Sequence, residues 1–531
     1  MGSNSVRPAG AVAQAFRPAP AGRRPALARR PFAARRATLA CALLLSACAS
    51  HPAHVTTAPT AADRVAALNH DLSTIFSTGP ASGALWGVRV ESLDHPGAPL
   101  FAINPDHLFV PASNMKLLTV AAAATRLGWD HTFETTVRAT TPVGSDGIVR
   151  GDLVVRGGGD PTIGNRSTSG GSLSTLADAL WQRGVRRVEG RIVGDASAFA
   201  REPLGEGWAW DDLPFAYSAP AGALIYNEND AQITVAPGAS VGTAAAVAVA
   251  DVDSGLHVRS SVTTGPPGSA TDVEVSRGLA SDEVEVHGTI AIDHGQVMRY
   301  AAVNDASRYF ASALRSALIA RGIVVRGPAV NGDDFPAGPI GGAAPVLATL
   351  TSPTLDVIAT RLLKVSQNLY AETFLRQLDA TPNHQASVSG GETALRQVLE
   401  GFGVSRGAFA QSDGSGLSRY NLVTPTAFVQ VLTAMAHNAQ LSAKWIAALP
   451  IGGADGTLQH RLAGTPAEGR VRAKTGSLSA VRALSGYVET AAGEHLAFSI
   501  LANNYAEPVT SEDIEKAMDD AIVCLVGFKR D

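Results

Sequence analysis

The sequence predicts an α/β (α+β) protein in which one mixed domain is divided by a large β-rich insertion. Segments with apolar residues at helical spacing lie toward both ends of the chain, whereas short β-type runs alternate with Gly, Pro and Ser turns from about residue 133 to 350. With 45% hydrophobic and 17% charged residues, the 531-residue chain can build large cores. Its apolar runs are shorter than the ~20 residues of a membrane span, so it is not a polytopic membrane protein.

The first 47 residues differ sharply in charge from the rest. They contain eight arginines and no lysine, aspartate or glutamate, so the remainder carries a net charge of −12 although the whole chain carries −4. A short apolar stretch from Ala37 to Ala47 follows the arginines, which is typical of a secretory signal peptide. We therefore predict a signal peptide over 1–47 and export to the periplasm. The acidic remainder argues against nucleic acid as a partner.

The apolar stretch ends in Leu45-Ser46-Ala47-Cys48, which resembles a bacterial lipobox with Cys48 as the site of lipid attachment. The triplet from Ala47 to Ala49 also fits the small-x-small pattern of ordinary signal peptidase, so both cleavage sites stay open. Under the first alternative the membrane contact is a lipid anchor only. Residues 48–62, rich in Ala, Thr, Pro and His, are predicted to be a flexible tether.

The elements of the first part follow from periodicity. Apolar residues at helical spacing predict a helix over 63–78, and alternation predicts strands over 85–93 and 100–103. A helix over 114–127 is apolar nearly all round, which indicates burial, and Gly128 is suited to end it.

The insertion and the last part are predicted in the same way. The insertion contains strand-like runs at 135–139, 152–156 and 187–194. Residues 227–300 are almost purely strand and turn. Within them, the segment 243–252 is as typical of a strand as of a helix. Helices are predicted at 308–321 and again from 353, followed by strands at 470–478, 483–489 and 495–502 and a helix at 511–526. We predict three domains: 63–132 with 350–531, 133–226 with 301–349, and a nested domain at 227–300.

Lysine is scarce, with six in the chain against 37 arginines, and one lies in Ser113-Asn114-Met115-Lys116. Residues three apart share one helix face, so the amine of Lys116 can reach the hydroxyl of Ser113. A buried lysine can have its pKa depressed into the range of a base, which arginine cannot. The alternative is a helix cap beside a surface lysine.

Two further motifs carry candidate chemistry. In Lys474-Thr475-Gly476 a fixed charge, a hydroxyl and a residue without Cβ would let a substrate carboxylate lie against a strand edge; the alternative is a plain edge strand. Between the lysine motifs, Ser366-Gln367-Asn368 could supply a hydroxyl for proton transfer and a carboxamide to hold a substrate amide; alone, it would be a cap and a turn.

In this order, the three motifs match the set found in penicillin-recognising enzymes. The flanking residues resemble the class C low-molecular-mass penicillin-binding proteins, the D-alanyl-D-alanine carboxypeptidase/endopeptidase family, in the stretches 109–116, 366–372, 413–419 and 473–478. The middle motif has Gln367 where Asp is common in relatives. The resemblance extends from about residue 80 to 505. It implies a β-lactamase/transpeptidase-like domain, an antiparallel sheet flanked by helices, split by a two-domain insertion.

The resemblance also implies roles for the site residues. Ser113 is the acylated nucleophile and Lys116 its base, Ser366 relays a proton to the leaving group, and Asn368 holds the substrate amide. The terminal carboxylate is bound by the Lys474-Thr475-Gly476 motif, and the backbone N–H groups of Ser113 and Ser477 form the oxyanion hole. Asp160, in Gly158-Gly159-Asp160-Pro161-Thr162, reaches toward the amine of the stem-peptide side chain; the alternative is an Asp-Pro turn.

The implied reaction is hydrolysis of D-Ala-D-Ala ends or cross-links of peptidoglycan through an acyl-Ser113 intermediate, without a cofactor. β-Lactams are expected to acylate the same serine. Two other functions stay open: a β-lactamase-like esterase or hydrolase on the same fold, and a non-catalytic lipoprotein that binds cell-wall peptides. A non-catalytic binding protein would need no base beside a serine, so the presence of Lys116 close to Ser113 argues against this alternative.

Other motifs are interpreted as structural. Gly238-Ala239-Ser240-Val241-Gly242 fits the nucleophile elbow of α/β-hydrolases, but its surroundings lack the required helix, so we interpret it as a turn. Residues 413–416 are expected to form a structural loop near the site, and Trp208 to pack in a loop. The 13 histidines show no metal-ligand spacing, and Cys524 is expected to be a small core residue.

Overall fold

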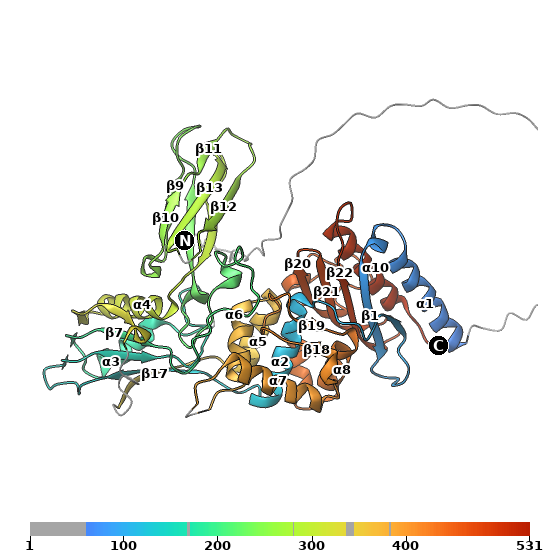
Figure 1. The fold of residues 1–531 in the computed structure, drawn as a ribbon, viewed down its shortest axis with the longest axis horizontal. Helices are drawn as coiled ribbons and strands as arrows, with labels where there is room; N and C mark the ends of the chain where they lie inside the picture. The colour runs from blue at the N-terminus through green and yellow to red at the C-terminus, as the bar shows by residue number, and fades with distance from the viewer. Residues whose placement is uncertain (1–59, 167–169, 280, 336–344, 382–383) are drawn as a thin grey trace, which may run out of the picture.

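A computed structural model describes residues 60–166, 170–279, 281–335, 345–381 and 384–531, and it confirms the α/β class (Figure 1). The predicted signal peptide, Cys48 and most of the predicted tether lie outside the described residues. The first helix begins at Ala61, inside the predicted tether, because Thr60 and Asp63 cap it reciprocally. None of the helices in the described ranges combines the length and apolar character needed to cross a membrane.

One antiparallel sheet contains both the first and the last strands of the described chain. Its order is β2-β1-β22-β21-β20, so strands far apart in the sequence pair and β20 lies at an edge. The bounds are β1 Leu85–Ser92, β2 Phe101–Ile103, β20 Val471–Leu478, β21 Val481–Glu489 and β22 His495–Asn503. An edge strand is free to receive an extended ligand.

Helices cover both faces of this sheet, as Figure 1 shows. The helices α1 (Ala61–Ser77) and α10 (Ser511–Gly527) pack on one face, around a core that includes Phe498 and Ile522. The other face carries α2 Met115–Leu127, α5 Leu355–Val365, α6 Asn368–Gln377, α7 Val388–Gly401, α8 Pro425–His437 and α9 Ser442–Ala448, with the short pair β18 Phe409–Ala410 and β19 Leu422–Val423. Helix α2 is buried from Met115 to Ala124, as its apolar composition predicted.

The insertion begins with a mixed sheet of order β16-β7-β5-β3-β17, packed against α3 (Leu173–Gln182) and α4 (Ala306–Ala320). Its strands are β3 Glu134–Ala139, β5 Leu153–Arg156, β7 Ile192–Asp195, β16 Ala329–Asn331 and β17 Val346–Thr351; a second sheet joins β4 Ile148–Val149, β6 Arg187–Val188 and β15 Val324–Val325. The strand predicted over 187–194 is therefore wrong as one element. Its two halves, β6 and β7, pair in different sheets.

The nested segment forms two further sheets, which extend as a separate lobe in Figure 1. The strands are β8 Asp230–Ala236, β9 Ala246–Val249 and β14 Val297–Ala302 in one sheet, and β10 His257–Ser260, β11 Thr263–Gly265, β12 Asp272–Arg277 and β13 Glu283–Ala291 in the other. The ambiguous segment 243–252 thus contains a strand. Because β9 follows Gly238–Gly242, that motif lacks the helix of a nucleophile elbow. The domain boundaries given above stay predictions.

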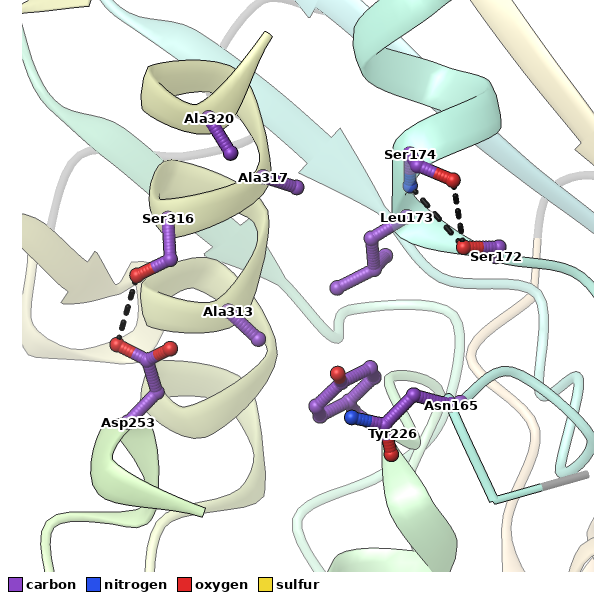
Figure 2. A pocket seen from close by; sticks show the side chains of 11 residues that line it. Asn165, Ser172, Leu173, Ser174, Tyr226, Asp253, Ala313, Ser316, Ala317 and Ala320 are labelled. Carbon is purple, nitrogen blue, oxygen red and sulfur yellow. Dashed lines mark hydrogen bonds between the residues drawn. The ribbon is translucent and has the colours of Figure 1, made fainter. Parts of the chain in front are cut away.

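A cavity of about 310 Å³ lies between α3 and α4 (Figure 2). Its lining includes Leu173, Tyr226 and Ala313, and the hydroxyl of Ser316 donates to Asp253 at its side (3.0 Å). None of the residues singled out as catalytic lines this cavity.

Candidate active site

The serine and the lysine of the first motif lie in contact at the start of the buried helix. Ser113 belongs to a short 3-10 helix, Ala112–Asn114, which leads directly into α2. The Nζ atom of Lys116 lies 2.8 Å from Ser113 Oγ, and the lysine is fully buried while the serine is half-buried. The alternative of a surface lysine is therefore wrong.

Lys116 has two other oxygen partners, Asn368 Oδ1 and Ser415 O, both at 2.6 Å. Burial lowers the pKa of Lys116 to about 7, against the opposing influence of Asp413 and Glu372. A neutral amine has two N–H groups and one lone pair. The two oxygens can accept both N–H groups, which leaves the lone pair for the Ser113 hydroxyl proton.

The middle motif lies where α5 ends and α6 begins. Ser366 has a left-handed backbone (φ 62°) at the end of α5, and Asn368 is the first residue of α6. This turn directs Asn368 Oδ1 to Lys116 and places Ser366 Oγ 2.9 Å from Lys474 Nζ. The hydroxyl of Ser366 thus lies beside Lys474, and the amide of Asn368 lies beside Lys116.

The third motif lies on the edge strand β20. Lys474 is fully buried, and burial together with the nearby Lys116 holds its pKa well below the usual value. The Thr475 hydroxyl donates to Thr457 (2.7 Å), and Ser477 is exposed at the strand edge. A Cβ on Gly476 would lie 3.1 Å from the Ser113 backbone nitrogen, so the glycine permits close approach of β20 to the serine.

The structure therefore brings Ser113, Lys116, Ser366, Asn368 and Lys474 into one connected set. A serine beside a neutral amine, with hydroxyl, carboxamide and strand-edge donors around it, can attack an acyl carbon and form an acyl-serine.

A buried carboxylate, Glu372, supports the loop beside Lys116, and the sequence analysis assigned it no role. Glu372 accepts the backbone N–H groups of Gly414 and Ser415 (2.9 Å each), and it pairs with Arg376 on α6. This holds the Ser415 carbonyl that contacts Lys116. Glu372 lies within 366–372, one of the stretches that resemble the family. That resemblance is the sequence signal that could have identified it.

Asp413 organises the remainder of the same loop. It accepts the N–H groups of Gly416 and Ser418 at 2.7 Å each, and the Nε1–H of Trp208 at 2.9 Å. The loop thus has the structural role expected for 413–416, and Trp208 packs against it as predicted.

The insertion also contacts the site. The side-chain nitrogen of Asn368 donates to the carbonyl oxygen of Tyr217 (2.7 Å), so the two ends of the Asn368 amide join Lys116 to the insertion. The two partners are 151 residues apart in the chain, and the acceptor is a backbone atom, so no sequence pattern could identify it.

Asp160 is buried, and the hydrogen bonds that the described structure gives it are to Thr162 and not to this connected set. Its Oδ1 accepts the N–H and hydroxyl of Thr162, while Oδ2 has no hydrogen-bond partner among the described residues. Burial raises the pKa of Asp160. The preceding Gly159 borders α6, since a Cβ there would lie 3.4 Å from Thr373.

The remaining candidates are placed as follows. Cys48 lies outside the described residues. Cys524 is half-buried in α10, and burial raises the pKa of its thiol to about 11. In the ranges that the structure describes, no cluster of three or more His, Cys, Asp or Glu side chains is arranged to hold a metal ion.

Comparison with known proteins agrees with this architecture. Residues 68–523 match the D-Ala-D-Ala carboxypeptidase 3 (S13) family. A D-alanyl-D-alanine carboxypeptidase of Actinomadura sp. (strain R39) is 35% identical over 455 residues, which cover 84% of this chain and 82% of the relative.

Solved structures are similar as well. The crystal structure of penicillin-binding protein 4 from Haemophilus influenzae superposes with a TM-score of 0.72 at 25% identity, covering 86% of this chain and 97% of that one. A second structure of that protein, complexed with a β-lactam, gives a TM-score of 0.68 over the same shares. The chain therefore belongs to the D-Ala-D-Ala carboxypeptidase 3 (S13) family of serine-type peptidases.

Proposed function

We propose that this protein is a serine D-Ala-D-Ala carboxypeptidase and endopeptidase that acts on peptidoglycan stem peptides and cross-links through an acyl-Ser113 intermediate. The observation that carries the proposal is the contact of 2.8 Å between Ser113 Oγ and the buried Lys116 amine. With a pKa lowered to about 7, that amine is available as a base at neutral pH.

Lys116 takes the hydroxyl proton as Ser113 Oγ attacks the carbonyl carbon of the penultimate D-alanine. The developing oxyanion is stabilised by the backbone N–H groups of Ser113 and Ser477, donors worth about 3 kcal/mol each in comparable sites. Collapse breaks the C–N bond, and Ser366, held by Lys474, passes a proton to the leaving amine. Water then cleaves the ester and frees Ser113.

The other motif residues bind the substrate. Asn368 holds the substrate amide, while Lys474, Thr475 and the close approach of β20 at Gly476 receive the terminal carboxylate. A β-lactam would acylate Ser113 by the same attack, with its leaving nitrogen retained in the opened molecule.

Asp160 would bind the amine of the stem-peptide side chain. Its buried Oδ2, without a partner in the described structure, and its raised pKa both indicate a carboxylate that an ammonium group would stabilise. Asp160→Asn should slow hydrolysis of peptides with a free side-chain amine but not of their N-acetylated counterparts. Equal loss on both substrates would contradict this role.

Labelling with a fluorescent penicillin tests the function. The parent protein and Ser405→Ala, an exposed control serine, should be labelled, and Ser113→Ala should not. The parent should also release D-alanine from peptides ending in D-Ala-D-Ala and cleave cross-linked muropeptides. Equal labelling of Ser113→Ala would overturn the proposal, and rapid turnover of the penicillin would favour a β-lactamase.

We further propose export to the periplasm and lipid attachment at Cys48, on the strength of the sequence alone. Labelling with a radioactive fatty acid should mark the parent protein and not Cys48→Ala. Label retained in the variant would contradict the anchor.

A further inference from the structure

The insertion contacts the middle motif at a second point, Glu228, in addition to the Tyr217 carbonyl. Glu228 Oε2 accepts the side-chain N–H of Gln367 (2.5 Å), and its Oε1 accepts from Arg361 Nη2 (2.6 Å) and from the hydroxyl of Tyr370 (3.1 Å). One insertion carboxylate thus joins the C-terminal half of α5 to the first turn of α6, on either side of the Ser366 turn.

The backbone at Glu228 is unusual. Three consecutive non-glycine residues are left-handed: Asn227 (φ 48°), Glu228 (φ 60°) and Asn229 (φ 53°). Such residues are uncommon, and side chains such as Asn and Asp tolerate this conformation best. Glutamate has no such local advantage, so its presence there requires another reason.

The two asparagines secure this turn to the insertion. Asn227 is buried, accepting from the Asn165 N–H (2.9 Å) and donating to Asp251 (2.8 Å). Asn229 is buried and donates to the Pro220 carbonyl (2.9 Å). With both neighbours held, Glu228 is presented toward α5 and α6 from a rigid support.

Gln367 transmits this contact to the candidate site. Its amide nitrogen donates to Glu228, while its amide oxygen accepts the N–H of Leu369 (3.2 Å) and so caps α6. The amide orientation is determined by having a carboxylate on one side and a helix N-terminus on the other. Gln367 stands between Ser366 and Asn368, whose side chains contact Lys474 and Lys116.

We propose that Glu228 is a positioning residue of the insertion, which acts through Gln367 to hold Ser366 and Asn368 at the two lysines. The inference rests on the proposed function, because it concerns the rate at which Ser113 is acylated. It assigns the insertion a share in catalysis that is separate from substrate binding. It also explains Gln367, since an acidic residue there would face the carboxylate of Glu228.

Shortening the side chain tests the proposal. Glu228→Asp keeps the charge and suits a left-handed backbone, but it withdraws the carboxylate by one methylene. We expect the second-order rate constant for acylation by a fluorescent penicillin to fall about 10- to 100-fold, as displacements of about 1 Å do elsewhere. The melting temperature should stay close to that of the parent.

Asp152→Glu is the matched control. Asp152 and Arg191 form a bidentate pair in the same insertion with similar side-chain exposure, 16% and 35%, against 22% and 40% for Glu228 and Arg361. Within the described part of the chain, the side chains of this pair bond to each other and not to the candidate site. The control should be acylated at the parental rate.

Exchanging the side chains of residues 228 and 367 tests whether the effect is one of positioning or of general destabilisation. Gln367→Glu places two carboxylates in contact and should slow acylation, whereas the double variant with Glu228→Gln restores an amide–carboxylate hydrogen bond and should recover most of the rate. Hydrogen exchange at the Leu369 backbone N–H should rise in Glu228→Asp and Gln367→Glu, because the side chain of residue 367 that caps α6 is then misplaced.

The two proposals fail in different ways. A parent protein that penicillin does not label would overturn the proposed function. Hydrogen exchange at Leu369 would still test the contact between Glu228 and Gln367. A labelled parent, with Glu228→Asp acylated at the parental rate and without rescue in the double variant, would overturn the role of Glu228.

Discussion

The side-chain oxygen of Asn368 lies 2.6 Å from the amine of Lys116, although 252 residues separate them in the chain. Together with the Ser415 carbonyl, it occupies the two N–H groups that a neutral lysine amine can donate. The amine therefore meets Ser113 with its lone pair, which is the orientation that a base requires.

The rate of acylation should depend on pH through Lys116. Its pKa is lowered to about 7, so the rate constant for acylation by penicillin should rise with pH through a midpoint near that value. Lys116→Met should lose activity about 10²- to 10⁴-fold, as enzymes without their base do. A parental profile that is flat across the neutral range would contradict Lys116 as the base.

Stability should change with pH in the same direction. Between about 7 and the ordinary lysine value of 10.5, the unfolded chain binds more protons at this position than the folded chain. The contribution of Lys116 to the free energy of unfolding therefore increases as pH rises through this interval. The free energy of unfolding of the parent and of Lys116→Met can be measured with urea at several pH values. The difference between the two slopes of that free energy against pH isolates the contribution of Lys116.

Recognition of the terminal carboxylate should depend on Lys474. The parent should prefer peptides that end in a free D-alanine carboxylate over the same peptides with an amidated end, and Lys474→Met should lose that preference. A hydrogen bond to a charged group contributes about 1.5–3 kcal/mol, or roughly 10- to 100-fold in kcat/KM. Lys444→Met is the control, because Lys444 pairs with Asp130 and Asp356 at the surface. An unchanged preference in Lys474→Met would assign the carboxylate elsewhere.

Gly476→Ala should impair acylation. The added Cβ would lie 2.8 Å from the Pro111 carbonyl oxygen and 3.1 Å from the Ser113 backbone nitrogen, so β20 and the serine must separate. We expect a loss of about 10- to 100-fold in the acylation rate constant. Gly407→Ala meets no atom within 4 Å and should acylate at the parental rate.

Glu372→Gln should separate the effect of the negative charge of Glu372 from the effect of its hydrogen bonds. The neutral amide oxygen can still accept the N–H groups of Gly414 and Ser415, but the charge that raises the pKa of Lys116 is lost. The midpoint of the pH–rate profile should therefore move to lower pH. Because the buried charge of Arg376 loses its counter-charge, although its hydrogen bonds to the backbone carbonyls of Glu372 and Glu202 stay, thermal unfolding should show a destabilisation of up to about 3–5 kcal/mol. A midpoint that moves to higher pH would contradict this account of the lysine.

The predicted elements were mostly correct where one periodicity dominates. Helix α2 and the strands β20 to β22 lie within a residue or two of the predictions, because their patterns reflect burial on one or both faces. The prediction of one strand over 187–194 failed because a β-type run does not reveal where a strand breaks or which strands it pairs with. Only the partners of β6 and β7, β4 with β15 on one side and β5 with β16 on the other, distinguish the two strands.

The sequence by itself determined the three motifs and the contact within the first one. Ser113 and Lys116 are three residues apart, and helical geometry alone brings them together. The tertiary structure decided the chemistry of that contact. Burial lowers the pKa of Lys116, and the Ser415 carbonyl, the Asn368 amide, the Tyr217 carbonyl and the Glu228 carboxylate come from distant segments. Their positions depend on how the sheets and helices pack, and such long-range packing leaves no local pattern in the chain.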